Sequence, residues 1–319
     1  MGRINKLGLF LTRNCNFYCN YCRNYCHDLK GRNPSDKLTF DELKDLLRQA
    51  HNMGARRLVI AGEGEPLLDE NLFPLIEYAQ ELEMRTDITS NISLVDEKSA
   101  QWLYAHTVRI FAKFFSFNPD RQDEVAGKKD CHTWVTYTDT GKNFTIPLGL
   151  KNLLDAGYGH RKGGFFSRHL LSIQPILTAR TIDDIVEIAK VCRSLGLGIY
   201  IKKRMAPQIS TFDKTLVPTK EQERHLCKRV ISLMDFESRA WLMLPCSFEV
   251  DPFIDINGNS RFCVNIDKSA GNIRTVPLKE LHREQMKVRD ALSKRSPRIK
   301  LFPKRFRHCR AKRSFNRIS

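Results

Sequence analysis

The stretch LGLFLTRNCNFYCNYC at residues 7–22 joins an apolar run directly to three closely spaced cysteines, Cys15, Cys19 and Cys22. A short apolar run bounded by polar residues is typical of a buried strand, which we expect over residues 7–12. The cysteines follow on a polar segment that we expect to be a loop. The fold expected for the rest of the sequence is worked out from this strand and from the cysteine-bearing loop that follows it.

Helix and strand patterns alternate over residues 7–204. Strands are expected at residues 7–12, 57–62, 85–91, 108–117, 168–178 and 198–204, with helices at 39–53, 70–83, 93–106, 148–157 and 181–196. Such alternation predicts right-handed βαβ units and a parallel sheet. Because six units do not complete an eightfold barrel, the expected fold class is α/β with a partial (β/α)6 barrel of the TIM type. The segment 118–147 breaks the rhythm and is expected to be a surface loop.

The remaining chain predicts a helix, a hairpin and a second helix. Pro218 begins a helical pattern, and Asn257-Gly258-Asn259 between two apolar runs is a hairpin signal. A further helix is expected over residues 277–293. We therefore expect three parts: a barrel over residues 1–210, a linking helix over 211–235 and a small α+β module over 236–319.

The chemistry of the cysteines points to metal ligation. The chain has 10 cysteines and no secretory signal pattern at its start, so we expect a cytoplasmic protein in which disulfides are improbable. The C-x3-C-x2-C spacing suits three irons of a [4Fe–4S] cluster and leaves one iron open to a small molecule. A zinc site is the alternative, although structural zinc sites use four tight ligands at other spacings. Cys26 is a candidate for a fourth ligand.

These residues, in this order, resemble the radical S-adenosylmethionine (SAM) enzymes, and the resemblance extends over residues 7–204. That family has a Gly-Gly-Glu-Pro-like motif after its second strand, and this chain has Glu63-Gly64-Glu65-Pro66 there. The resemblance implies a [4Fe–4S] cluster and SAM as cofactors. It also implies reductive cleavage of SAM to a 5′-deoxyadenosyl radical, which abstracts a hydrogen atom from a substrate.

The resemblance further implies a set of SAM contacts. Tyr21 matches the aromatic residue that lies beside the adenine, and Gly64, Glu65 and Pro66 match the motif that meets the amino group. Polar residues at the ends of the third and fourth strands are expected near the ribose and the methionyl group: Ser90, Asn91, Ser116 and Asn118. Ordinary turn chemistry at strand ends is the alternative for these polar residues.

Three further cysteines, Cys246, Cys263 and Cys309, resemble the ligands of a Twitch module, a shortened SPASM domain that holds an auxiliary [4Fe–4S] cluster. The resemblance implies a C-x2-C pair at the end, but Lys312 replaces its second cysteine. Three interpretations stay open. Another residue, such as Cys227 or His308, completes the cluster; the fourth iron is open to substrate; or the thiols are merely buried.

The other cysteines have competing interpretations. Some radical SAM epimerases quench the substrate radical with a thiol, and Cys131 and Cys227 are the candidates for such a hydrogen donor. Cys131 lies in the segment expected to cover the barrel mouth. Cys192 falls on the apolar face of a predicted helix and is expected to be part of the core.

Charge and hydropathy limit the partners. The formal net charge is +17, and no apolar run approaches the ~18 residues of a membrane helix, so no membrane partner is expected. The segment from Lys294 onward is basic and contains aromatic residues, a composition that also occurs in nucleic-acid-binding proteins. A solvated basic surface is the simpler interpretation, and nucleic acid is not the expected partner.

These features predict a radical SAM oxidoreductase or epimerase that takes electrons from a donor such as flavodoxin or ferredoxin. A small polar substrate of the aminoglycoside or aminocyclitol type is expected, with epimerisation or dehydrogenation as the outcome. A polycationic substrate fits a basic protein poorly, and modification of a ribosomal peptide is the alternative. A nucleic-acid-binding iron–sulfur protein is a third hypothesis.

Overall fold

The computed structural model describes six stretches of the chain: residues 3–22, 34–159, 170–203, 217–233, 251–263 and 266–295. Three cysteines of the sequence analysis, Cys26, Cys246 and Cys309, lie outside these residues, as does His308. Cys227 and Cys263 lie on described elements, but their side chains are outside the description. The auxiliary cluster therefore stays a prediction from the sequence.

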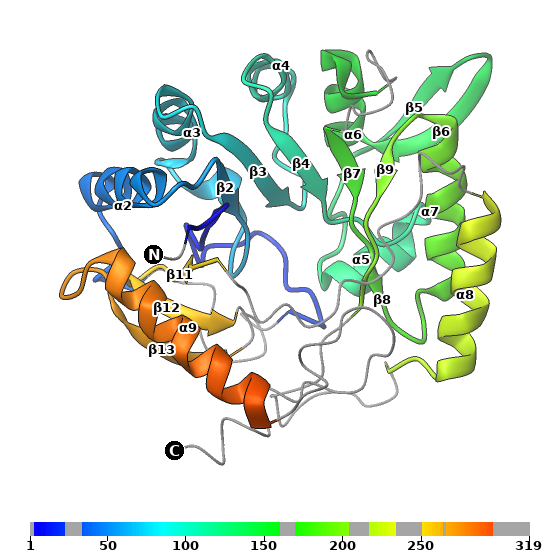
Figure 1. The fold of residues 1–319 in the computed structure, drawn as a ribbon. Coiled ribbons are helices and arrows are strands. Elements are labelled where there is room, and N and C mark those ends of the chain that lie inside the picture. Colours follow the sequence, from blue (N-terminus) through cyan, green and yellow to red (C-terminus); the bar gives the residue numbers. More distant parts are fainter. Residues whose placement is uncertain are drawn as a thin grey trace.

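A parallel sheet forms the centre of the structure, as the alternating pattern predicts (Figure 1). Its parallel strands follow one another in chain order: β1 (Leu7–Leu9), β2 (Arg57–Ile60), β3 (Arg85–Ser90), β4 (Arg109–Ala112), β7 (Leu171–Ile173) and β9 (Gly198–Ile199). Short additions, β8 (Ile176–Leu177) and β10 (Lys202–Lys203), pair with each other beyond β7 and β9. The carboxyl ends of the strands consequently meet at one edge, where loops can bring side chains together.

Helices follow the outer side of this curved sheet (Figure 1). They are α2 (Phe40–Asn52), α3 (Leu72–Glu81), α4 (Glu97–Ala105), α6 (Leu148–Leu153) and α7 (Ile182–Ser194). In α2, the buried residues Leu43, Leu46, Leu47 and Ala50 recur at helical spacing and form the face that meets the sheet. Thr39 and Glu42 form a capping box that begins this helix.

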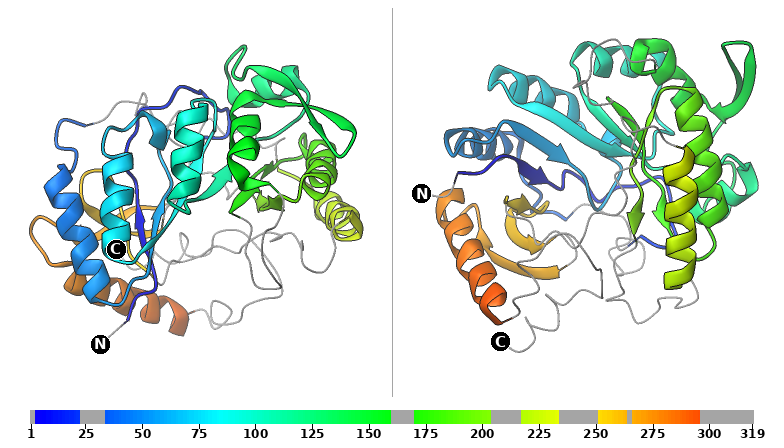
Figure 2. Two further views of the ribbon diagram at one scale, coloured as in Figure 1. Left: turned by 90° about the horizontal axis from the view of Figure 1, so that it is seen from above. Right: turned by 45° about the vertical axis from the view of Figure 1, so that its right-hand side comes forward.

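The outer layer continues beyond these helices. A π-helical turn, Leu154–Tyr158, extends α6, and α8 (Lys220–Leu233) packs on α7 (Figure 2). Cys192 on α7 is fully buried in the core, as the sequence predicts. Among the described helices, none combines the length and the apolar character that crossing a bilayer requires.

The C-terminal hairpin extends the central sheet through β1. Strand β11 (Phe253–Ile254) pairs in parallel with β1, and β12 (Asn259–Cys263) and β13 (Ile266–Asn272) continue it in antiparallel fashion under α9 (Leu278–Arg295). Gly8 makes this pairing possible, because a Cβ there would lie 2.2 Å from the ring of Phe253. The sequence predicts the hairpin and α9, but neither β13 nor the union with β1.

The prediction of a surface loop over residues 118–147 is wrong. The segment contains the helix α5 (Pro119–Ala126) and a hairpin of β5 (Trp134–Asp139) and β6 (Lys142–Pro147), which projects from the molecule (Figures 1 and 2). Asn118 caps α5, and Pro119 follows it at the first helical position. The alternation of Thr with larger side chains in β5 is a strand signal that the polar composition of the segment conceals.

An exposed ion pair attaches the C-terminal elements to α2. Arg274, between β13 and α9, donates to Glu42 (Nη2 to Oε2, 2.9 Å), and both side chains are about one-third exposed. The hydrogen bond from Arg274 lowers the pKa of Glu42 to about 2. Because the folded pKa is depressed, the pair contributes stability above the ordinary glutamate pKa of about 4.3, and this contribution is lost as the pH falls through 2.

Arg274→Ala is therefore expected to lower the free energy of unfolding by about 0.5–1 kcal/mol at pH 7. The difference between the variant and the parent should shrink below pH 4 and vanish near pH 2. Urea unfolding of both proteins at several pH values measures it. A difference that stays constant over this range would contradict the assignment.

Candidate functional site

The cysteine loop, residues 13–22, follows β1 at the carboxyl edge of the sheet. Cys15 and Cys19 are half-buried and pack against an apolar cluster of Phe17, Ala126 and Cys131. The main chain of the loop is bound to the end of α5, since the amide of Tyr18 donates to the carbonyl of Ala126 (2.9 Å). The helix that the sequence analysis missed therefore supports the loop that carries the cysteines.

The thiols of this loop lie in a desolvated environment. Burial raises the pKa of Cys15 to about 11 and that of Cys19 to about 12, and electrostatic repulsion from the neighbouring Cys22 adds to the effect on Cys19. Within the described part of the chain, no three Cys, His, Asp or Glu side chains converge on a single metal ion. A [4Fe–4S] cluster makes no such demand, because each thiolate binds a different iron. The donor set fits three irons of such a cluster.

Gly64 allows the loop after β2 to touch the cysteine loop. A Cβ on Gly64 would lie 2.5 Å from the carbonyl oxygen of Asn14 and 2.6 Å from that of Thr12. With glycine there, the amide of Glu65 donates to the carbonyl of Asn14 (2.8 Å). The Gly-Glu-Pro motif and the cysteines are thus joined through their main chains, only one residue before Cys15.

The carboxylate of Glu65 is buried and held by the end of β3. It accepts hydrogen bonds from Ser90 Oγ (2.8 Å), from the amide of Asn91 (2.7 Å) and from the amide of Leu67 (3.2 Å). Burial raises the pKa of Glu65 to about 7 despite these donors. The structure therefore brings together Glu65, Ser90 and Asn91, while Pro66 begins the 3-10 turn Pro66–Leu68 that follows.

Asn91 also reaches the cysteine loop. Its Nδ2 donates to Asn16 Oδ1 (2.8 Å), and Asn16 Nδ2 donates to Ser93 Oγ (2.8 Å). Asn16 immediately follows Cys15, and no sequence motif marks it. The only sequence signal for this contact is the residue type, because an Asn amide can both donate and accept hydrogen bonds between two loops.

Ser116 and Asn118 act at the start of α5 in this structure. Ser116 Oγ donates to Asp184 Oδ1 (2.6 Å), and Asn118 Oδ1 accepts from the amide of Arg121 (3.1 Å). Gln122, which the sequence analysis missed, accepts from the amides of Phe115 (2.9 Å) and Ser116 (3.2 Å). These contacts join the segment that follows β4 to α5 and α7.

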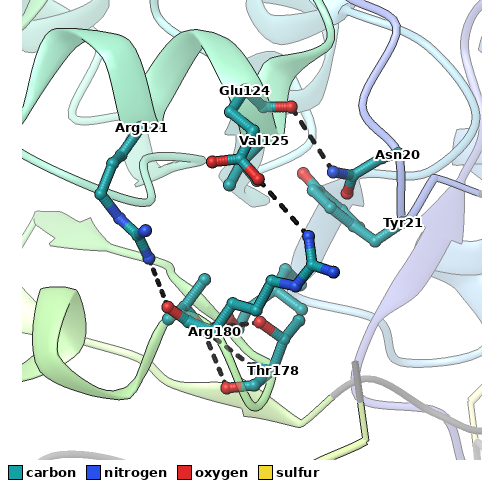
Figure 3. A pocket seen from close by; sticks show the side chains of 9 residues that line it. Asn20, Tyr21, Arg121, Glu124, Val125, Thr178 and Arg180 are labelled. Atoms are coloured by element: carbon teal, nitrogen blue, oxygen red, sulfur yellow. Dashed lines mark hydrogen bonds and ion pairs between the residues drawn. The ribbon is translucent and has the colours of Figure 1, made fainter. Parts of the chain in front are cut away.

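A small pocket of mixed polar and apolar lining adjoins Tyr21 (Figure 3). It lies between the cysteine loop, α5 and the turn after β8, and it is lined by Asn20, Tyr21, Arg121, Glu124, Val125, Ile176, Thr178, Arg180 and Thr181. The ring of Tyr21 contacts that of Phe115 edge-on, with centroids 5.1 Å apart. Arg180 extends towards Glu124 across the pocket, with 3.6 Å between Nη1 and Oε1.

Cys131 and Lys113 lie close to the cysteine loop from two other elements. Cys131 is only 4% exposed, and its main-chain amide donates a hydrogen bond to Asp123 Oδ1 (3.1 Å). Lys113 follows β4, and its pKa lies well below the usual value because of burial and of the nearby Lys202 ammonium. The thiolates of the loop act on Lys113 in the opposite direction. The lysine within the apolar run FAKFF is the sequence signal for this residue, and the sequence analysis did not use it.

Comparison with known proteins finds the superfamily that the sequence resembles. Residues 9–137 match the Radical SAM superfamily. A GTP 3′,8-cyclase of Microcystis aeruginosa (strain NIES-843) is 29% identical over 137 residues, which are 42% of this chain and 41% of that protein. A GTP 3′,8-cyclase of Picosynechococcus sp. matches with the same identity and coverage. The matched region spans about two fifths of the length of these relatives.

Two solved structures share the fold. Streptococcus suis SuiB bound to S-adenosylmethionine superposes with a TM-score of 0.63 at 15% identity, over 88% of this chain and 65% of that one. Native anSMEcpe with bound AdoMet gives 0.60 at 15% identity, over 88% of this chain and 82% of that one. These structures show the mixed α/β fold, and the sequence match supports a radical SAM domain over residues 9–137. The Twitch module and the roles of individual site residues stay predictions.

The contact at Gly64 leads to a direct test. Gly64→Ala is expected to destabilise the protein by about 1–3 kcal/mol, because the added methyl group meets main-chain carbonyls that cannot move independently. The displaced cysteine loop should also retain less iron after anaerobic reconstitution. Thermal unfolding and iron analysis measure the two effects.

Gly141→Asn is the matched control for this substitution. Gly141 has a positive φ (+76°), unlike Gly64, but nothing lies within 4 Å of a Cβ there, and Asn tolerates this conformation. The control should keep the iron content and the stability of the parent. Equal iron content in Gly64→Ala and the parent would show that the close approach at Gly64 is dispensable for the site.

Proposed function

We propose that this protein binds a [4Fe–4S] cluster through Cys15, Cys19 and Cys22 and uses SAM to abstract a hydrogen atom from a substrate. When bound, the cluster supplies one electron to the SAM sulfonium, which yields methionine and a 5′-deoxyadenosyl radical. The observation that carries the proposal is the meeting of the cysteine loop with Glu65 through the main-chain hydrogen bond to Asn14. Protein groups then position the reactants and exclude water.

The buried carboxylate of Glu65 is suited to an ammonium group. Ser90 and Asn91 hold it in one orientation, and its desolvation makes a positive partner favourable. This supports an assignment of Gly64, Glu65 and Pro66 to the amino group of SAM. Tyr21 borders a small pocket with polar groups at its rim, and its aromatic ring supports placing the adenine beside this residue.

The formal net charge of +17, rather than an unpaired cation in the site, favours a substrate with an anionic group. Arg121 is paired with Asp184 (2.9 Å), and Arg180 with Glu124 (3.6 Å). Lys113 also lies beside the cysteine loop, but burial holds its pKa well below the usual value, so it adds little positive charge there. GTP, which the curated relatives are named for, is also anionic. We therefore favour an anionic small molecule over the polycationic aminoglycoside expected from the sequence, with an acidic peptide as the alternative.

The fate of the substrate radical depends on groups outside this site. Oxidation needs an acceptor such as the auxiliary cluster predicted at Cys246, Cys263 and Cys309, whereas a redox-neutral outcome needs a hydrogen donor. Cys131 stays a candidate donor, and its position against the Phe17 cluster keeps it close to the cysteine loop. Cys227 stays a candidate on sequence grounds alone.

The test is SAM cleavage by the anaerobically reconstituted protein. With dithionite, the parent should release 5′-deoxyadenosine, whereas the triple variant Cys15→Ala, Cys19→Ala, Cys22→Ala should release at least about 100-fold less, because the electron donor to SAM is gone. Cys192→Ala is the matched control, since this thiol is fully buried on α7 away from the loop. Loss of cleavage in the control as well, or cleavage by the triple variant, would exclude the proposed role of the loop.

The same proteins report on the auxiliary cluster. About eight irons in the parent and about four in the triple variant would establish a second [4Fe–4S] cluster and favour oxidation. About four irons in the parent and none in the triple variant would show that the auxiliary cluster is absent and would favour a thiol as the hydrogen donor. Iron and sulfide analysis on gel-filtered protein gives the numbers.

A further inference from the structure

Glu63, which precedes the Gly-Glu-Pro motif, lies between two arginines in the protein interior. Its Oε2 accepts from Arg13 Nε (2.8 Å), and its Oε1 faces Arg261 Nη2 (3.8 Å). The side chains are 5% exposed for Glu63, 13% for Arg13 and 8% for Arg261. Charges this far from water depend on one another, because the removal of one leaves the others uncompensated.

Arg261 is fixed to the C-terminal hairpin on its other side. Its Nε donates to Asp255 Oδ2 (2.8 Å), and Asp255 Oδ1 also accepts the amides of Asn257 (3.1 Å) and Asn259 (2.9 Å). Gln285 of α9, fully buried, donates to the carbonyl of Arg261 (3.1 Å). Any shift of the hairpin or of α9 therefore moves the guanidinium that faces Glu63.

Arg13 is fixed at the opposite side. It precedes Cys15 by two residues, and its Nη2 donates to Asn257 Oδ1 of the hairpin turn (3.3 Å). Glu63 precedes Glu65 by two residues, and Arg261 precedes Cys263 by two. The buried ion network of Arg13, Glu63, Arg261 and Asp255 thus joins the cysteine loop, the motif loop and the hairpin strand that carries a predicted ligand of the auxiliary cluster.

We propose that Glu63 is a positioning residue that couples the C-terminal hairpin to the cysteine loop through Arg13 and Arg261. The inference rests on the proposed function, and it adds that the C-terminal elements control how the loop holds iron and SAM. Glu63 itself stands where the resembled family has glycine in its Gly-Gly-Glu-Pro-like motif. The coupling therefore depends on a residue that the motif of the resembled family does not contain.

The experiment compares Glu63→Gln, Arg261→Gln and the double variant in the full-length reconstituted protein. Each single variant should increase the rate of iron release to a chelator and the Kd for SAM about tenfold. The double variant should show no further increase, since both substitutions break the same link. Arg261→Lys keeps a charge facing Glu63 and should release iron at a rate between those of the parent and Arg261→Gln.

Asp87→Asn is the matched control. Asp87 is a buried carboxylate (9% exposed) that also lies between two arginines, Arg57 (3.6 Å) and Arg109 (3.7 Å), nearer the amino ends of the strands. Its substitution should lower the melting temperature while iron release and SAM binding stay within twofold of the parent. The coupling is refuted if Asp87→Asn releases iron as fast as Glu63→Gln at equal loss of thermal stability. It is refuted equally if the effects of the single variants multiply in the double variant.

A readout on iron-free protein separates this inference from the proposed function. Alkylation of Cys15 and Cys19 by iodoacetamide, followed by peptide mass spectrometry, should be about tenfold faster in Glu63→Gln and Arg261→Gln than in the parent and in Asp87→Asn. Absence of SAM cleavage by the parent would refute the proposed function and leave this result standing. Equal alkylation rates in all proteins would refute the coupling and leave SAM cleavage standing.

Discussion

The loop after β1 passes so close to the loop after β2 that Gly64 has no room for a side chain. Main-chain carbonyls of Thr12 and Asn14 occupy the space where a Cβ would lie. This approach sets the hydrogen bond between Glu65 and Asn14, and it places the buried carboxylate of Glu65 within reach of Ser90 and Asn91. Three consecutive parallel strands are thereby joined at their carboxyl ends.

Two supports outside those strands complete the arrangement. At the end of α5, the carbonyl of Ala126 accepts a hydrogen bond from the amide of Tyr18. Gly127, which ends this helix, lies against the carbonyl of Tyr18. On the other side, the C-terminal hairpin reaches Arg13 through Asn257 and reaches Glu63 through Arg261. The cysteine loop has little regular structure of its own, so its shape depends on neighbours that are distant in sequence.

The parallel sheet and its helices were predictable because apolar periodicity depends on neighbouring residues in the sequence. The repeat of Leu43, Leu46 and Leu47 in α2 is an example, as is the apolar run of β1. The structure of segment 118–147 was not predictable, because its Thr, Asp and Lys residues conceal the alternating pattern of strands β5 and β6. The hairpin of β11 and β12 was predictable from the turn at Asn257-Gly258-Asn259, but the pairing of β11 with β1 was not, because the two strands lie far apart in the sequence.

The cysteines could be chosen from the sequence because their chemistry and spacing are local properties, whereas the Gly-Glu-Pro motif and Tyr21 were chosen from the resemblance to radical SAM enzymes. The sequence by itself therefore determined the class of site and the order of the strands that carry it. Only the tertiary structure decided that Asn16 meets Asn91, that Gln122 holds the segment after β4, and that Glu63 lies between two arginines. These contacts join residues on different strands and loops, and burial makes them strong, so they follow from packing rather than from any local pattern.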